Sequence, residues 1–243
     1  MNKDALLSEK EKRQLRGKIG QLLWVAKQSR PDILFDTCIL ASSLKDAKVK
    51  DILLANKLVS RVKSNNVSLM FQDLGECTPT LVIFSDASFA NLPSGGSQGG
   101  YFIILMSGNG KFSPIAWNSK KIQRVARSTL AAETLAMTNA IDSGIVLANL
   151  YREIMRGELS VVCITDSKSL YEATRSNKSV LEKRLRVEIH SIREVLDNRT
   201  IKQLKWSAAS RQLADCLTKH GASHLSMMKA LDEGQIDIED ILI

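Results

Sequence analysis

Four carboxylates stand in unusual places along this chain. Asp86 ends or interrupts one short apolar run, and Asp166 follows another. Glu133 and Asp215 lie in alanine- and leucine-containing stretches with helical spacing. An unpaired carboxylate in apolar surroundings is costly, and no lysine or arginine is an evident partner for each of the four. Divalent cations would satisfy such a cluster, and Mg²⁺ is the ion that suits carboxylate oxygens together with a substrate phosphate.

Each acid taken alone has an ordinary structural interpretation. Asp86 and Asp166 could cap turns that follow strands. Glu133 could be a solvated acid near the start of a helix, and Asp215 could lie on the exposed face of an amphipathic helix. All four together favour a shared site, because strands that lie side by side under packed helices can bring such acids to one edge of a sheet.

The elements that must position these acids begin at Thr80, where the pattern of the chain changes. Residues 1–79 have the apolar spacing of helices, interrupted where Pro31 pushes its preceding residue out of helical geometry. Residues 80–220 predict five strands, at 81–84, 99–106, 112–117, 161–165 and 201–206. Helices are predicted at 128–150, after residue 167, near 180–197 and at 211–219. This hairpin meander followed by crossover units predicts an α/β fold with a mixed sheet.

The chain has 243 residues, of which 44% are hydrophobic and 25% charged, an ordinary globular composition. Its charge of +8 suits a polyanionic partner, although residues 221–243 are predicted to form an acidic, solvated tail. No stretch approaches the roughly 18 apolar residues of a membrane span and the first residues are too polar for a signal peptide, so we expect an intracellular protein with no membrane partner. The cysteines lack a CxxC pair, which argues against structural zinc. We expect Trp24, Trp117 and Trp206 in the core.

Five motifs follow one another in a specific order. They are FSDASFA (84–90), WNSKK (117–121), STLAAET (128–134), ITDSKSL (164–170) and RQLADCLTK (211–219). In this order they resemble the ribonuclease H domain of copia-type retrotransposon Pol polyproteins. Two earlier stretches are similar to the region that joins the reverse transcriptase to that domain, namely IGQLLWVAKQSRPDILFD (19–36) and LLANKLVSRVK (53–63).

The resemblance implies a ribonuclease H-like mixed five-stranded sheet with helices on both faces, preceded by a small thumb- or connection-like helical segment. It implies metal-dependent endonucleolytic hydrolysis of the RNA strand of RNA–DNA hybrids. The catalytic and metal-binding residues would be Asp86, Glu133, Asp166 and Asp215, holding two Mg²⁺ ions, or Mn²⁺, that activate water and stabilise the leaving oxygen. The implied partners are the hybrid and the polymerase portion of the same polyprotein, in a cytoplasmic virus-like particle or the nucleus.

Basic and polar side chains near these acids are candidates for binding the hybrid. Those we predict are Ser88, Asn118, Ser119, Lys120, Lys121, Arg124, Arg127, Lys183, Arg184 and Arg186. The cations would track phosphates, whereas the serines and Asn118 could contact the 2′-hydroxyl groups that distinguish RNA. For the cluster at 183–186 a solvated helix face is an equal alternative, because glutamates interleave with it.

Two features of the chain depart from the family pattern. It has no Tyr-x-Asp-Asp element and so cannot polymerise by itself, and it lacks a histidine in the loop before the last acid. His220 follows Asp215 by five residues and could substitute for that histidine, although an incidental surface histidine is the favoured interpretation.

Two other functions compete with this interpretation. An integrase or transposase nuclease uses three acids ending in a helical glutamate, and the position of Glu133 between Asp86 and Asp166 argues against it. A catalytically silent or domesticated fragment could bind nucleic acid or dock on a polymerase, but the presence of all four acids favours an enzyme. We predict a helical segment at 1–79 and a ribonuclease H-like domain at 80–220.

Overall fold

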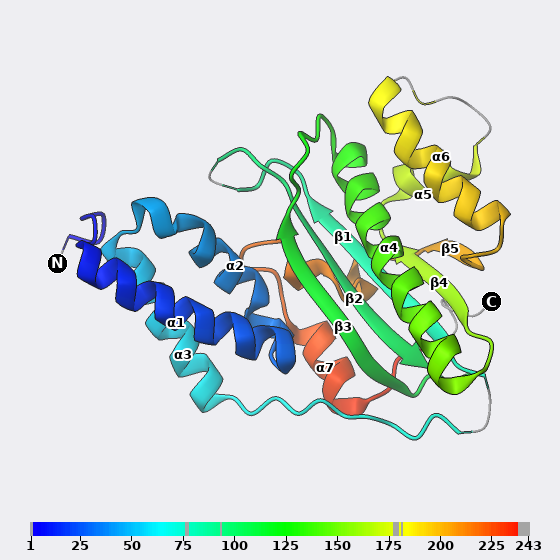
Figure 1. Ribbon diagram of the computed structural model, residues 1–243, viewed down its shortest axis with the longest axis horizontal. Helices are drawn as coiled ribbons and strands as arrows, with labels where there is room; N and C mark the ends of the chain where they lie inside the picture. Colours follow the sequence, from blue (N-terminus) through cyan, green and yellow to red (C-terminus); the bar gives the residue numbers. More distant parts are fainter. Residues whose placement is uncertain (1, 76–77, 93, 177–179, 181, 238–243) are drawn as a thin grey trace. The chain divides into compact units, whose positions relative to one another are not determined.

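The computed structural model describes residues 2–75, 78–92, 94–176, 180 and 182–237. It divides the chain into two units, Met1–Ser68 and Leu69–Ile243, whose helices and strands are labelled in Figure 1. Within the described ranges, no helix combines the length and apolarity that crossing a membrane requires.

Within the described residues, the first unit contains three helices, in the part of the chain whose apolar spacing predicts helices. They are α1 (Glu9–Gln28), α2 (Leu34–Ser43) and α3 (Val49–Ser64), with the 3₁₀ turns η1 (Pro31–Ile33) and η2 (Leu44–Asp46) between them. α1 begins at a capping box in which Ser8 and Glu11 bond to each other's backbone N–H. Its buried residues follow helical spacing and are Leu15, Ile19, Leu22 and Ala26. Trp24 lies opposite this stripe and is 68% exposed, so its predicted place in the core is wrong.

A buried ion pair lies at the break between α1 and α2. Arg30 donates two hydrogen bonds to the two carboxylate oxygens of Asp32, at 2.8 and 2.9 Å, and both side chains are buried. Arg30 also donates to the backbone carbonyls of Val62 and Asn65, at 3.2 and 3.0 Å. Arg61 Nε lies 3.2 Å from Asp32 Oδ2. These bonds join the start of α2 to the end of α3.

The second unit contains one five-stranded mixed sheet in the order β3-β2-β1-β4-β5. Its strands are β1 (Thr80–Ser88), β2 (Gln98–Met106), β3 (Phe112–Lys121), β4 (Ser160–Thr165) and β5 (Gln203–Trp206). The first three form an antiparallel meander, whereas β4 runs parallel to β1, and β5 parallel to β4. The long central strand β1 therefore pairs with β2 along one side and with β4 along the other.

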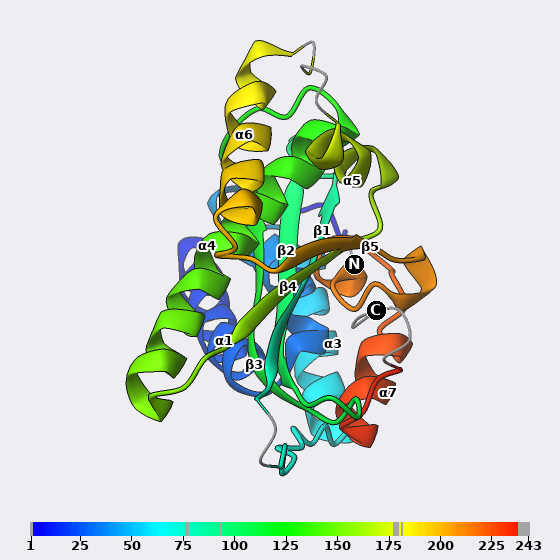
Figure 2. The same ribbon diagram turned by 90° about the vertical axis from the view of Figure 1, so that its right-hand side faces the viewer.

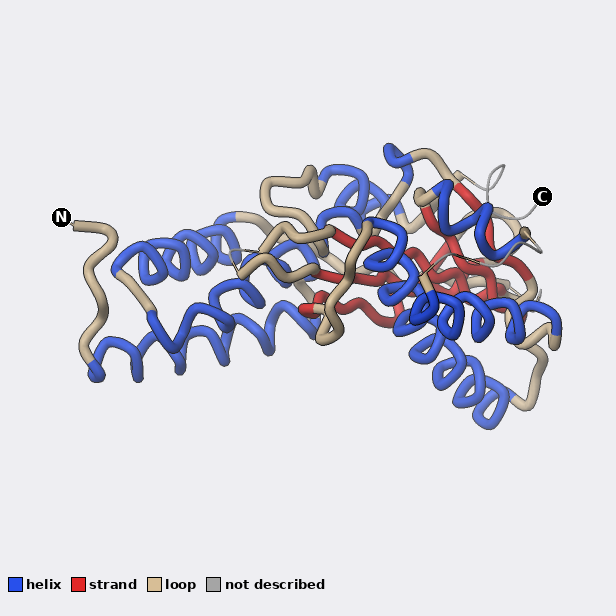
Figure 3. The backbone as a smooth tube through the Cα atoms, turned by 90° about the horizontal axis from the view of Figure 1, so that it is seen from above, coloured by secondary structure: helices blue, strands red, loops and turns tan. Residues whose placement is uncertain are grey.

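Helices cover both faces of the sheet, as Figure 2 and the view from above in Figure 3 show. α4 (Thr129–Met155) and α6 (Lys183–Asp197) lie on one face and α7 (Leu225–Glu233) on the other, while α5 (Lys168–Arg175) follows β4. α4 packs so closely on β1 that a side chain at Gly144 would collide with Ile83. The predicted α/β class, mixed five-stranded sheet and two-sided helical cover are confirmed.

The ends of the second unit differ from the sequence-based outline. Residues 69–75 belong to this unit, because the backbone N–H of Gln72 donates to Ser113 Oγ of β3 at 3.0 Å. Residues 221–237 are not simply a solvated tail, because α7 buries Met227, Ala230 and Leu231. The remainder of the predicted tail, residues 238–243, lies outside the described residues.

The segment that carries Asp215 also differs from its prediction. Instead of a helix over 211–219, the structure has the single 3₁₀ turns η3 (Ala209–Arg211) and η4 (Asp215–Leu217). Between the turns, Gln212 Nε2 donates to the backbone carbonyl of Ser85 at 3.0 Å, which fixes the segment to β1.

Candidate metal centre and active site

Three of the four predicted acids meet at one edge of the sheet. Asp86 lies inside β1, Asp166 follows the last residue of the neighbouring parallel strand β4, and Asp215 begins η4. One carboxylate oxygen from each of the three lies within 4.8 Å of the others. Parallel strands end at the same edge of a sheet, and this places the first two acids side by side. The cluster offers only oxygen ligands, a set that suits a divalent cation such as Mg²⁺ or Mn²⁺.

Neighbouring side chains hold two of these acids in place. The Trp206 indole donates to the backbone carbonyl of Asp166 at 2.9 Å, which joins β5 to the end of β4. Thr218 Oγ1 donates to Asp86 Oδ2 and also, at 3.0 Å, to the backbone carbonyl of Asp215. Thr218 therefore links β1 to η4, and its role was not predicted from the sequence.

Burial determines the protonation of the acid in β1. Asp86 is 1% exposed, and desolvation raises its pKa to about 7, although Lys219 and the hydrogen bond from Thr218 oppose the shift. Desolvation also raises the pKa of Asp166, against the charge of Lys219. A bound divalent cation would reverse both shifts by stabilising the ionised forms.

Glu133, the fourth predicted acid, lies outside the three-acid cluster, but the charges of that cluster act on it. It sits in the first turns of α4, whose start is capped by Ser128, and its side chain is buried. Desolvation first, and then the charges of Asp86 and Asp166, raise its pKa to about 9. Its Oε2 has no hydrogen-bond partner among the described residues. A buried oxygen without a donor among the described residues, on a carboxylate whose pKa two other acids raise, fits a site that takes a cation.

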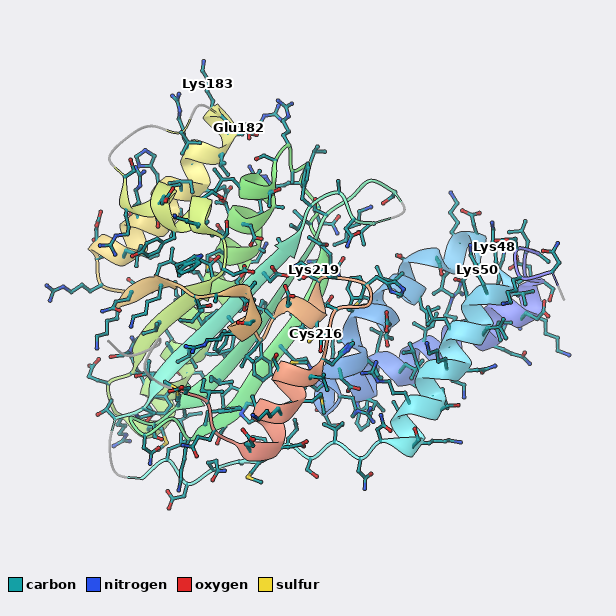
Figure 4. The ribbon with its side chains drawn as sticks, turned by 180° about the vertical axis from the view of Figure 1, so that it is seen from behind. Lys48, Lys50, Glu182, Lys183, Cys216 and Lys219 are labelled. Atoms are coloured by element: carbon teal, nitrogen blue, oxygen red, sulfur yellow. The ribbon has the colours of Figure 1, made fainter. Side chains whose placement is uncertain are left out.

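Lys219 is the main residue of the site that the sequence reasoning missed. Its Nζ lies 3.5 Å from Asp86 Oδ1 and forms an ion pair with Asp215 Oδ1. The signal was present in the chain, because Lys219 follows Asp215 by four residues. Figure 4 shows it on the segment that leads toward α7.

Some of the predicted nucleic-acid-binding residues line a groove beside this centre. Asn118, Lys120, Lys121 and Arg124 line it together with Gly100, which pairs with Asp86 across β1 and β2. α4 contributes further polar groups that the sequence reasoning missed, Asn139 and Ser143. The groove therefore combines cations and amides along β3 and α4.

The other predicted binding residues are distributed differently. The side chains of Ser88 and Ser119 are buried, and Ser119 Oγ donates to the backbone carbonyl of Leu217 at 2.6 Å, so it supports η4 from β3. Arg127 is exposed, and Arg124 forms an ion pair with Glu188 of α6. At the start of α6, shown in Figure 4, Lys183 and Arg184 are exposed, whereas Arg186 is half-buried and donates to the backbone carbonyl of Val180 at 2.6 Å.

Comparisons with known proteins identify one similar sequence and several similar solved structures. No family model matches the chain. Over 205 residues it is 28% identical to the retrovirus-related Pol polyprotein from transposon TNT 1-94 of Nicotiana tabacum, a match that covers 83% of this chain and 15% of the polyprotein. The chain thus spans less than a sixth of that relative's length.

Solved structures with similar folds include two ribonucleases H1 and one viral enzyme. LC11-RNase H1, isolated from compost, is 15% identical with a TM-score of 0.44, and the match covers 63% of this chain and 96% of that one. RNase H1 from Halobacterium salinarum is 18% identical with a TM-score of 0.42, covering 57% and 94%. The prototype foamy virus protease–reverse transcriptase is 16% identical with a TM-score of 0.38, covering 70% and 22%. The chain is thus similar, over 205 residues, to part of a retrotransposon Pol polyprotein.

Proposed function

We propose that this chain is the ribonuclease H part of a copia-type retrotransposon Pol polyprotein, located toward its C-terminal end. The observation that carries the proposal is the meeting of Asp86, Asp166 and Asp215, from three separate elements. Glu133 supports it, because its buried Oε2 has no hydrogen-bond partner among the described residues and Asp86 and Asp166 raise its pKa. The reaction would be endonucleolytic hydrolysis of the RNA strand of an RNA–DNA hybrid inside the cell.

The four carboxylates would hold two divalent cations, which supply Lewis acidity to an attacking water and to the leaving oxygen of the phosphodiester. Thr218 orients Asp86. The hydrogen bond from the Gln212 side chain to the backbone carbonyl of Ser85 in β1 holds the Asp215 segment in place. The buried side of the cluster limits the access of bulk water, which strengthens charge interactions there.

Substrate placement would fall to the groove beside the centre. Lys120, Lys121 and Arg124 carry positive charge suited to phosphates, and affinity through such contacts falls as salt rises. Asn118 in the same groove could hydrogen-bond with a 2′-hydroxyl. In the polyprotein, the polymerase portion would deliver the hybrid, and it is the partner we propose for the complete molecule.

Cleavage of a labelled RNA–DNA hybrid tests this proposal. With Mg²⁺, the wild-type chain should cut the RNA strand, whereas Asp166→Asn should lose at least about 1,000-fold in rate, equivalent to about 4 kcal/mol of barrier. Asp197→Asn is the matched control, because Asp197 is an exposed aspartate at the end of α6. Equal rates for wild type and Asp166→Asn, or no cleavage by either, would leave only a nucleic-acid-binding or polymerase-docking fragment.

A substitution at Gly100 provides a second test of the site, because Gly100 packs against η4, the turn that carries Asp215. A Cβ at this position would lie 2.8 Å from Leu217 Cβ and 2.9 Å from Thr218 Cγ2. Gly100→Ala should therefore displace the turn that carries Asp215, lower Mg²⁺ affinity about 10-fold and cost about 1–3 kcal/mol of stability. Calorimetric Mg²⁺ titration and urea unfolding measure the two effects. Gly108→Ala is the control, since a Cβ there meets nothing within 4 Å, and unchanged Mg²⁺ affinity in Gly100→Ala would contradict the prediction.

A further inference from the structure

Lys219 holds its ammonium group against the carboxylates of the proposed metal centre. Its Nζ lies 3.5 Å from Asp86 Oδ1, and it forms an ion pair with Asp215 Oδ1. The Lys219 side chain is 38% exposed, so part of it is in contact with solvent. It comes from the residue after Thr218, and that threonine already occupies the other oxygen of Asp86.

The ammonium of Lys219 and a divalent cation would compete for the same two carboxylates. Asp86 and Asp215 are two of the three acids whose ligand atoms lie within 4.8 Å of one another. A cation held between these carboxylates would meet the lysine at short range, and two positive charges there repel each other strongly in partly buried surroundings. This repulsion favours movement of the ammonium away from carboxylates that hold a cation.

The charges around Lys219 show what it does when no metal is bound. Burial lowers the pKa of Lys219, but the charges of Asp86, Asp215 and Asp166 together outweigh burial and raise the pKa above its usual value. Lys219 also opposes the raised pKa of Asp86. Lys219 therefore offsets part of the mutual repulsion of the acids in the metal-free fold.

We propose that Lys219 is the resident counter-cation of the acidic cluster, and that a divalent cation binds by displacing its ammonium from Asp86 and Asp215. This inference rests on the proposed metal-dependent function. It assigns Lys219 two opposite effects: it stabilises the metal-free fold and it weakens metal binding. A residue that merely helped to hold the acids in place would strengthen metal binding instead.

The test compares Lys219→Met, which keeps most of the aliphatic stem and loses the charge, with Lys219→Arg, which keeps the charge. Lys229→Met is the surface control, because Lys229 lies on α7 and is 75% exposed. Calorimetric titration with MgCl₂ measures affinity, and thermal unfolding in EDTA and in Mg²⁺ measures stability.

Lys219→Met should bind Mg²⁺ about 10-fold more tightly than wild type, equivalent to about 1.4 kcal/mol, and should melt at a lower temperature in EDTA. Its melting temperature should rise more on adding Mg²⁺ than that of wild type. Lys219→Arg and Lys229→Met should bind Mg²⁺ as wild type does. If Lys219→Met is unfolded in EDTA, Mg²⁺ should restore its fold, and Lys219→Gln should show the same gain in affinity.

Two kinds of failure can be told apart. If wild type binds Mg²⁺ and cleaves the hybrid, but Lys219→Met binds Mg²⁺ equally or more weakly, the counter-cation role is wrong and the proposed function stands. If Mg²⁺ binds to neither wild type nor any Lys219 variant, the metal-dependent function fails together with this inference.

Discussion

Replacing Asp86 with asparagine should abolish hydrolysis of the RNA strand and, at the same time, stabilise the metal-free protein at pH 8. The activity should fall at least about 1,000-fold, because the substitution removes a charged metal ligand from the centre of the cluster. Asparagine has nearly the same shape as aspartate and can still accept the hydrogen bond from Thr218. The fold should therefore persist while the buried charge disappears.

The stability gain follows from the direction of the pKa shift of Asp86. Burial raises this pKa from 3.8 to about 7, so between these values the folded chain binds more protons than the unfolded chain. Stability of the metal-free protein must then fall as pH rises from about 4 to about 7. Glu133, with its pKa raised to about 9, extends the fall to higher pH. The Asp86→Asn variant should not lose stability between about pH 4 and pH 7 through this group, because asparagine does not titrate.

Thermal unfolding in EDTA at pH 5 and pH 8, together with the hybrid cleavage assay, checks both effects. Wild type should melt at a lower temperature at pH 8 than at pH 5, and Asp86→Asn should show a smaller difference. Two results would contradict the assignment of Asp86. One is cleavage by Asp86→Asn at the wild-type rate, and the other is a drop in its melting temperature between pH 5 and pH 8 that is larger than the drop in wild type.

Removing Asp32 should produce the largest loss of stability in the first unit. Asp32→Ala leaves the Arg30 guanidinium buried without its two carboxylate bonds, and an arginine cannot shed its charge. Breaking a buried pair in this way costs about 3–5 kcal/mol. Because Arg30 also bonds to the carbonyls at the end of α3, the loss should reach all three helices.

Hydrogen exchange measured by mass spectrometry over residues 9–64 detects this loss, with exchange in the second unit as an internal reference. Arg61→Met should have a smaller effect, since Arg61 is partly exposed and its removal leaves the Arg30 pair intact. The double variant Arg30→Met/Asp32→Leu should recover much of the protection, because no buried charge remains. A cost below about 1 kcal/mol for Asp32→Ala would show that the pair is not structural.

The sequence could predict the fold because its strands carry strong local signals. A few neighbouring residues are enough to predict β4, which is a continuous apolar run, and the turn before β3, which contains Asn109-Gly110. The break at Pro31 is likewise local, because a proline restricts the residue before it. Asp86, Asp166 and Glu133 could be singled out because a charge in an apolar stretch is visible without a structure.

The remaining errors concern features that depend on tertiary contacts. The Asp215 segment has helical spacing, yet Gln212 bonds to the backbone of β1 and the chain makes 3₁₀ turns instead. Ser119 reads as an exposed polar residue of β3, but η4 packs over it and buries it. The full role of Lys219 is not visible in the sequence, because this one lysine contacts two acids that are far apart in sequence.

The chemistry of the cleaved ends tests the central claim most directly. If carboxylate-bound cations activate a water, the RNA fragments should carry 3′-hydroxyl and 5′-phosphate ends, and cleavage should stop in EDTA. Mass spectrometry of the products from a defined RNA–DNA hybrid identifies these groups. Fragments ending in 2′,3′-cyclic phosphate, formed with or without Mg²⁺, would show that the RNA's own hydroxyl attacks and would contradict the account.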